Sequence, residues 1–190
     1  MGHRDDDAAG RFFETLRQPG DGYRGSATGP VDTRAETLDD ATVVRAIFVA
    51  CHRGSLDGAG LDDVTIERLM QHRFDMQRAG YRFSLPDAVW EVITEADRVV
   101  GQVLTHDDGE RVLVAELAVA PEHRGRGIGG DTVAGLIGRA GERPLELRLG
   151  HGSPSEAWYR SQGFELVGSD DHQIHLLRLP HATALAATGV

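Results

Sequence analysis

A glycine-rich turn with two arginines is the part of this sequence best suited to binding a charged ligand. It reads Arg124-Gly125-Arg126-Gly127-Ile128-Gly129-Gly130, follows an apolar stretch and precedes apolar residues at helical spacing. Glycines at the start of a helix let a ligand approach the backbone, and the free N–H groups there attract anions. The arginines add positive charge, so these residues predict a phosphate or pyrophosphate site.

Two common phosphate-binding motifs match this turn only in part. A P-loop requires a lysine, and all 20 basic residues of the chain are arginine. The spacing Gly125-x-Gly127-x-x-Gly130 matches the dinucleotide fingerprint, which follows its strand directly in a repeating strand–helix–strand fold. Here Pro121 to Arg124 intervene, and the preceding strands are predicted to form a meander. A dinucleotide-binding protein is therefore the minor alternative.

A second stretch, from Ser153 to Glu165, places a tyrosine near the end of a predicted helix and ends in Tyr159-Arg-Ser-Gln-Gly163-Phe164. Together with Arg124–Gly129, in this order, it resembles the GCN5-related N-acetyltransferases, the GNAT superfamily. The turn is similar to that family's acyl-CoA pyrophosphate loop, and residues 144–165 to its fifth strand and fourth helix. The resemblance covers residues 31–180, with specific motifs in 116–130 and 144–165.

The resemblance implies an α/β (α+β) fold with a central mixed, mostly antiparallel twisted sheet of about seven strands, flanked by about four helices. Apolar periodicity and turn residues predict strands near 31–37, 88–94, 99–104 and 111–119. Helices are predicted after Asp39-Asp40, from Asp62 to Gly80 and after Gly130. The resemblance implies further strands near 144–149, 165–168 and 174–179 and a helix before Gly163. The helix that ends at Gly80 is expected to bury Ile66, Leu69, Met70, Phe74 and Met76.

The resemblance also implies direct transfer of an acetyl group from acetyl-CoA to an amine. Tyr159 is then the acid that protonates or hydrogen-bonds the departing thiolate. Many relatives have an Asn where this chain has Ser153, which can cap the helix but reaches less far. The residues expected to contact the cosubstrate are Leu117, Ala118 and Val119 along the pantetheine arm, Arg124, Gly125, Arg126, Gly127, Ile128, Gly129 and Gly130 at the pyrophosphate, and Ser153.

Glu116 is the first candidate for the general base. It directly precedes Leu-Ala-Val, and strict alternation puts it on the same strand face as Val112, Val114 and Ala118. Loss of water around a carboxyl raises its pKa toward the range useful for a base. The alternative is a carboxylate in an ordinary ion pair with an arginine. Glu146 and His151 are reserve candidates.

The composition restricts the class of partner. The formal net charge is -10, which disfavours a broad electrostatic grip on nucleic acid and fits a cationic or neutral acceptor such as an aminoglycoside, a polyamine or a peptide N-terminus. Residues 53–86 precede the sheet and are expected to hold acceptor specificity. The functional alternatives are a non-catalytic acyl-CoA-binding regulatory module and transfer of a longer acyl chain.

The acetyltransferase domain is predicted at 31–180, between a flexible arm at 1–30 and a tail at 181–190. The N-terminus lacks the pattern of a secretory signal, and the apolar runs are too short for a membrane helix, so we expect a cytoplasmic protein with no membrane partner. Cys51 lies outside both motifs and offers no acyl-enzyme nucleophile. No metal site is predicted, and a homodimer remains open.

Overall fold

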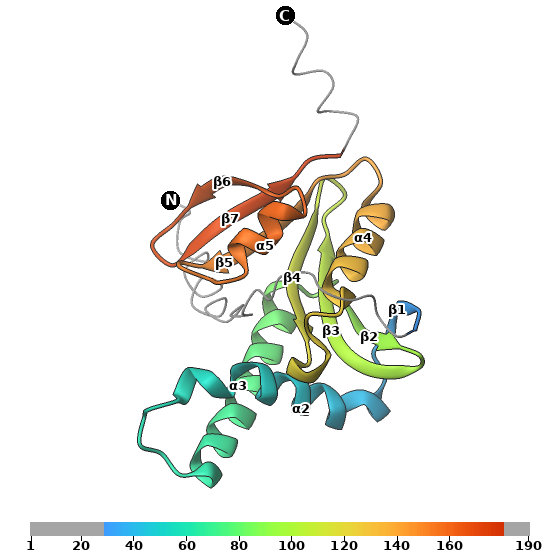
Figure 1. Cartoon of the computed structure of the whole chain (residues 1–190). Helices are drawn as coiled ribbons and strands as arrows, with labels where there is room; N and C mark the ends of the chain where they lie inside the picture. Colours follow the sequence, from blue (N-terminus) through green and yellow to red (C-terminus); the bar gives the residue numbers. More distant parts are fainter. Residues whose placement is uncertain (1–28, 181–190) are drawn as a thin grey trace, which may run out of the picture.

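Short apolar strands separated by turn residues build the sheet of this protein. A computed structural model describes residues 29–180 (Figure 1). The strands are β1 (Val31–Ala35), β2 (Val89–Glu95), β3 (Arg98–Asp107), β4 (Val112–Val119), β5 (Leu145–Gly150), β6 (Glu165–Ser169) and β7 (Gln173–Arg178). The helices are α2 (Ala41–His52), α3 (Asp63–Ser84), α4 (Ile128–Ala140) and α5 (Glu156–Ser161), with 3-10 turns η1 (Leu38–Asp40), η2 (Arg53–Leu56) and η3 (Pro121–His123).

The strands form one seven-stranded sheet in the order β1-β2-β3-β4-β5-β7-β6. Within residues 29–180 every neighbouring pair is antiparallel except β4 and β5, which are parallel. Helices α2 and α3 pack on one face of the sheet, and α4 and α5 pack on the other (Figure 1). This arrangement confirms the predicted fold class. Residues 1–28 of the predicted arm and the predicted tail at 181–190 lie outside the described residues.

Strand β4 changes its neighbour and its pleat halfway along its length. It pairs with β5 from Val112 to Val114, and beyond that point the two strands run apart (Figure 1). At the same place Ala115 is an extra residue opposite β3, because Leu104 faces Glu116 while the next β3 residue faces Val114. Residues 116–119 therefore pair with β3 on one side and have no pairing with β5 on the other.

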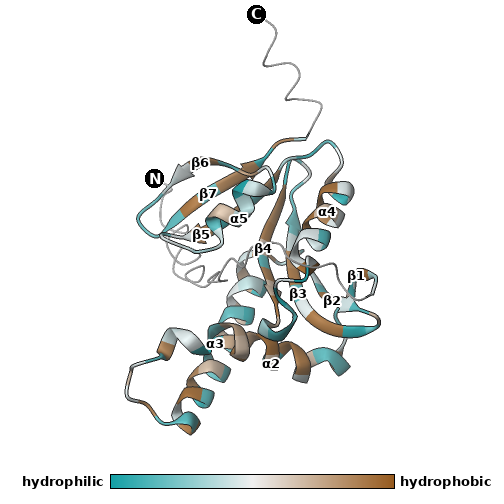
Figure 2. Cartoon of the chain, viewed as in Figure 1, coloured by the Kyte–Doolittle hydropathy of each residue, from teal (hydrophilic) through white to brown (hydrophobic). Residues whose placement is uncertain are grey.

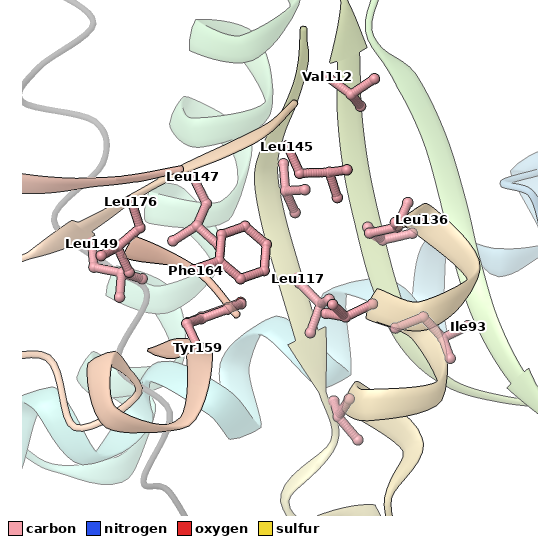
Figure 3. Close-up of a cluster of buried hydrophobic side chains, with 14 of the residues drawn as sticks. Ile93, Val112, Leu117, Leu136, Leu145, Leu147, Leu149, Tyr159, Phe164 and Leu176 are labelled. Carbon is pink, nitrogen blue, oxygen red and sulfur yellow. The ribbon is translucent and has the colours of Figure 1, made fainter. Parts of the chain in front are cut away.

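The largest buried cluster lies between the sheet and helices α4 and α5 (Figure 3). In Figure 2 the hydrophobic colour follows much of the central strands, and the hydrophilic colour is frequent on the loops. The cluster is therefore a continuous core that holds β4, β5 and the two helices together. Its members are Ile93, Val100, Val103, Val112, Val114, Leu117, Val119, Ile128, Val133, Leu136, Ala140, Leu145, Leu147, Leu149, Tyr159, Phe164, Ile174 and Leu176.

Helix α3 corrects the prediction that Gly80 ends it. The helix continues to Ser84 because Tyr81 anchors it: this side chain is buried, and its hydroxyl donates to the Ala115 carbonyl at 2.9 Å. That tertiary contact overrides the weak helix propensity of glycine. The predicted apolar stripe is also partly wrong, since Leu69 and Met76 are exposed. The residues that α3 buries are Ile66, Met70, Phe74, Gln77 and Tyr81.

Candidate active site

The glycine-rich turn lies between η3 and the N-terminus of α4. Gly125 and Gly127 have φ angles of 71° and 85°, a left-handed conformation that side chains other than glycine's rarely adopt. Gly127 is also the N-cap of α4, so the N–H groups of the first turn, from Ile128 onward, point out of the helix end. The backbone thus offers several donors at the positive end of the helix dipole. This geometry suits the oxygens of a pyrophosphate.

Arg124 fastens the start of this turn to the rest of the domain. Its Nε donates to the Val119 carbonyl at 3.0 Å, and its Nη2 donates to Cys51 Sγ at 3.1 Å. The Cys51 thiol lies near the end of α2, 73 residues earlier in the chain. One arginine therefore connects the end of β4, helix α2 and the turn, a bracing role that the sequence motif did not indicate.

Arg126 fastens the turn to the β2–β3 hairpin. Its Nη2 donates to Glu95 Oε1 at 2.5 Å, and its Nη1 lies 3.0 Å from His123 Nδ1. His123 Nδ1 is also 3.4 Å from Glu95 Oε2, and the Glu95 side chain is only 6% exposed. The positive charge of Arg126 is thus balanced by a nearly buried carboxylate. An incoming phosphate would share this arginine with Glu95.

Tyr159 sits at the base of α5 in the large buried cluster. Its ring packs edge-on against Phe164, with ring centroids 5.6 Å apart (Figure 3), and against Trp158 at 4.7 Å. No residue between 29 and 180 forms a hydrogen bond with its hydroxyl. Burial raises the pKa of this phenol above its usual value, so the hydroxyl keeps its proton and remains available as a donor.

The turn and the tyrosine helix contact each other directly. A Cβ added at Gly129 would lie 3.4 Å from the Trp158 ring, which means that this ring rests on the first turn of α4. Trp158 also packs against the buried cluster that contains Tyr159. The structure therefore brings together the two motifs predicted from sequence, beside the point where β4 and β5 separate.

Glu116 is buried on the face of the sheet that α2 and α3 cover, opposite the face on which Tyr159 packs. Gln102 Nε2 on β3 donates a hydrogen bond to Glu116 Oε1. Burial raises the pKa of this carboxyl to about 7, because loss of hydration outweighs the bond from Gln102 and the attraction of Arg78. The carboxyl therefore titrates near neutral pH, as a general base requires.

The extra residue Ala115 corrects the predicted neighbours of Glu116. Val112 and Val114 precede the bulge and face α4, whereas Glu116 and Ala118 follow it and face α2 and α3. Strict alternation cannot anticipate a bulge, since one inserted residue exchanges the two faces. Glu116 and Tyr159 thus lie on opposite faces of β4 and flank the segment that has no pairing with β5.

The remaining candidates are engaged in local contacts. Ser153 is nearly buried, and its Oγ accepts from the Ser155 N–H at 3.3 Å in the turn before α5. Glu146 forms ion pairs with Arg111 at 2.6 Å and with Arg148 at 3.2 Å. His151 is exposed, and its Nε2 lies 2.7 Å from the Asp170 carbonyl. The two reserve bases, Glu146 and His151, are thus already engaged with other groups.

Several contacts around the site escape prediction from sequence because their partners are far apart in the chain. These are Cys51 with Arg124, Glu95 with Arg126, and an ion pair between Glu36 and Arg78. One signal was visible: Gln102 interrupts the apolar run from Val99 to Leu104, where a buried amide needs a partner. That partner is Glu116.

Comparison with known proteins identifies the domain. The sequence profile of the family described as "Acetyltransferase (GNAT) domain" matches residues 86–166, which contain β4, the glycine-rich turn and Tyr159. Residues 86–166 are therefore similar to a GNAT acetyltransferase domain. A protein from Rhodococcus opacus named mycothiol acetyltransferase is 42% identical over 94 residues. That alignment covers 49% of this chain and 30% of the relative, so the chain spans under a third of that relative's length.

Solved acetyltransferase structures share the fold of this protein. PaiA N-acetyltransferase from Thermoplasma acidophilum, in complex with coenzyme A, aligns with a TM-score of 0.59 at 12% identity, covering 79% of this chain and 99% of that one. An acetyltransferase from Thermus thermophilus aligns with a TM-score of 0.59 at 18% identity, covering 80% and 99%. At these identities the likeness shows the fold.

Two further properties concern the part of the chain that the structure describes. None of its helices combines the length and the apolar character needed to cross a membrane. Nor do three or more His, Cys, Asp or Glu side chains converge there as metal ligands. His175 Nε2 lies 3.0 Å from Asp170, which forms a single pair.

Proposed function

We propose that this protein is an acyl-CoA-dependent N-acetyltransferase that moves an acetyl group directly from acetyl-CoA to an amine of a small molecule or a peptide N-terminus. The observation that carries the proposal is the contact between Gly129 and Trp158, which joins the glycine-rich turn to the helix of Tyr159 at the divergence of β4 and β5. The matched GNAT domain and relatives named acetyltransferases support the same activity.

Acetyl-CoA fits the residues present. The left-handed glycines, Gly125 and Gly127, leave the backbone open, and the N–H groups from Ile128 to Gly130 would bind the pyrophosphate. Leu117 to Val119 would lie along the pantetheine arm, on the side of β4 that β5 leaves. The Val119 carbonyl already accepts from Arg124, and the Ala118 backbone faces β3, so the Leu117 backbone and the Val119 N–H are the expected contacts in this segment. Ser153 would act mainly by shaping the start of α5.

Transfer requires a neutral amine, stabilisation of the tetrahedral oxyanion and a proton for the thiolate. Glu116 would take a proton from the ammonium form of the acceptor, directly or through water. The amine then attacks the thioester carbonyl, and the nitrogen of the tetrahedral intermediate loses its second proton to water. The C–S bond breaks, and the Tyr159 hydroxyl hydrogen-bonds the departing sulfur or protonates it and regains its proton from water. Cys51 is a poor acyl-enzyme nucleophile, because burial raises the pKa of its thiol to about 11. This supports direct transfer in a ternary complex.

A binding titration followed by an activity assay tests the proposal. Acetyl-CoA and CoA should raise the melting temperature of the purified protein, and NAD and ATP should not. Release of CoA thiol should then depend on an amine, screened among polyamines, aminoglycosides, peptides and compounds related to mycothiol. Stabilisation by NAD alone would favour a dinucleotide site, although the antiparallel strands β2 to β4 differ from the fold that such a site needs. CoA binding without thiol release from any amine would favour a regulatory module.

A further inference from the structure

A buried arginine lies on the same face of the sheet as Glu116. Arg78, on α3, donates from Nη2 to Glu36 Oε1 at 2.7 Å, and the two side chains are 12% and 11% exposed. Its guanidinium carbon lies 4.1 Å from the Trp90 ring centroid and 5.3 Å from that of Phe74. Its Nη1 is buried without a hydrogen-bond partner among the described residues. Packing thus holds the Arg78 guanidinium in place, and its Nη1 can still donate a hydrogen bond.

Strand register places this cation near Glu116. Trp90 faces Leu104 on β3, and Leu104 faces Glu116 on β4, so the three residues form one row across the sheet. Neighbouring strands are about 4.8 Å apart, which puts the two ends of the row roughly 10 Å apart. Arg78 stacks on Trp90 at one end of this row, and Tyr81, three residues later on α3, packs in one cluster with Leu104 in the middle of the row. It is therefore close enough to interact with Glu116 through a medium of low polarity.

The groups around Glu116 come from every element packed against it. They are Gln102 from β3, Arg78 and Tyr81 from α3, Glu36 from the segment after β1, and Cys51 from α2. Tyr81 and Cys51 are neutral, since burial raises the pKa of both. Arg78 lowers the pKa of Glu116 and Glu36 raises it, against the larger effect of burial. The charge of Glu116 thus depends on one cation and one anion.

We propose that Arg78 is a positioning residue that, together with Glu36, controls whether Glu116 carries its negative charge during the reaction. The inference rests on the proposed function, in which Glu116 is the base. Arg78 attracts the carboxylate form of Glu116, and Glu36 both holds Arg78 in place and partly cancels its charge. Residues 53–86 are predicted to hold acceptor specificity. Arg78 lies in this region, so the same region would also set the charge of the general base, Glu116.

Two substitutions that remove charges of opposite sign test the proposal. Arg78→Gln should move the titration of Glu116 to higher pH by on the order of one unit, and Glu36→Gln should move it to lower pH. The readout is the infrared band of the protonated Glu116 carboxyl as a function of pH, assigned by its loss in Glu116→Gln. Arg45→Gln is the matched control: the Arg45 guanidinium carbon also lies near the Phe74 ring, 5.4 Å from its centroid, but Arg45 pairs with exposed Asp75, so the band should not move.

If Arg78 had only a structural role, Arg78→Gln would destabilise the protein, but the two substitutions would not move the Glu116 titration in opposite directions. Shifts in the same direction in both variants, or no shift in either, would overturn the proposal. Should Arg78→Gln fail to fold, Glu36→Gln alone must still move the titration to lower pH, and an unmoved band would refute it. The infrared readout needs no acceptor, so it separates this inference from the proposed function: full activity of Glu116→Gln would remove the base while leaving the electrostatic result intact.

Discussion

At the scale of single residues, burial raises the pKa of both proposed catalytic groups and gives them different roles. Burial keeps the Tyr159 phenol protonated and brings the Glu116 carboxyl to a pKa of about 7. The first therefore donates and the second accepts at neutral pH. Sequence alone could nominate both residues, but only the fold shows that they lie on opposite faces of β4.

Tyr159→Phe should lower turnover by about a hundredfold or more and change CoA affinity by less than about threefold. The hydroxyl has no hydrogen bond within the described residues, so the variant keeps the ring contacts with Trp158 and Phe164 and should keep its melting temperature. Stopped-flow thiol release and calorimetry with CoA separate the two effects. Unchanged turnover would remove Tyr159 from the proton transfer, and equal losses in turnover and affinity would make it a binding residue.

The pH dependence of the reaction should report Glu116. Because the pKa of this carboxyl is about 7, the active carboxylate is lost as the pH falls below that value, and kcat/KM should fall about tenfold per unit on the acidic limb. Glu116→Gln should lower the plateau and abolish that limb. A limb that persists unchanged in the variant would assign the base to another group, for which Glu146→Gln and His151→Gln are the next comparisons.

At the scale of elements, the turn before α4 matters more for its backbone than for its arginines. Gly127→Ala forces a side chain into a left-handed conformation at the helix N-cap, at a cost of about 1–2 kcal/mol, and should weaken CoA binding by about tenfold. Gly135→Ala is the matched control, because this position in α4 has open space for a Cβ and should gain about 0.5–1 kcal/mol of stability without altering affinity. Calorimetry and thermal melting measure both. Equal CoA affinity in the two variants would contradict a backbone cradle.

The elements also show what the sequence could and could not predict. Strand and helix positions followed from periodicity because most strands have one apolar face and clear turn residues, as in Ala96-Asp97 between β2 and β3. The end of α3 could not be predicted from periodicity, because it depends on the contact of Tyr81 with a carbonyl of β4 that lies 34 residues away. The face of the sheet on which Glu116 lies could not be predicted either, because the bulge at Ala115 has no glycine or proline to mark it.

At the scale of the whole molecule, holding Glu116 in the core should reduce stability at alkaline pH. Its pKa in the folded state, about 7, exceeds the usual value of 4.5, so the folded protein binds this proton more tightly than the unfolded chain. The stability that this proton contributes is complete below the unfolded pKa and is lost as the pH rises toward 7. Above that pH, the ionised carboxylate remains a cost to folding.

Glu116→Gln should therefore raise the free energy of unfolding at pH 8, by on the order of 3 kcal/mol at most, and change it little at pH 4.5. The amide has nearly the same shape and can still contact Gln102, so the difference reports the charge. Urea unfolding at the two pH values measures it, with exposed Glu142→Gln as the control that should show no such pH dependence. A variant that is less stable than the wild type at pH 8 would mean that the carboxylate stabilises the fold. Its role would then be structural rather than that of a base kept ready at a cost to folding.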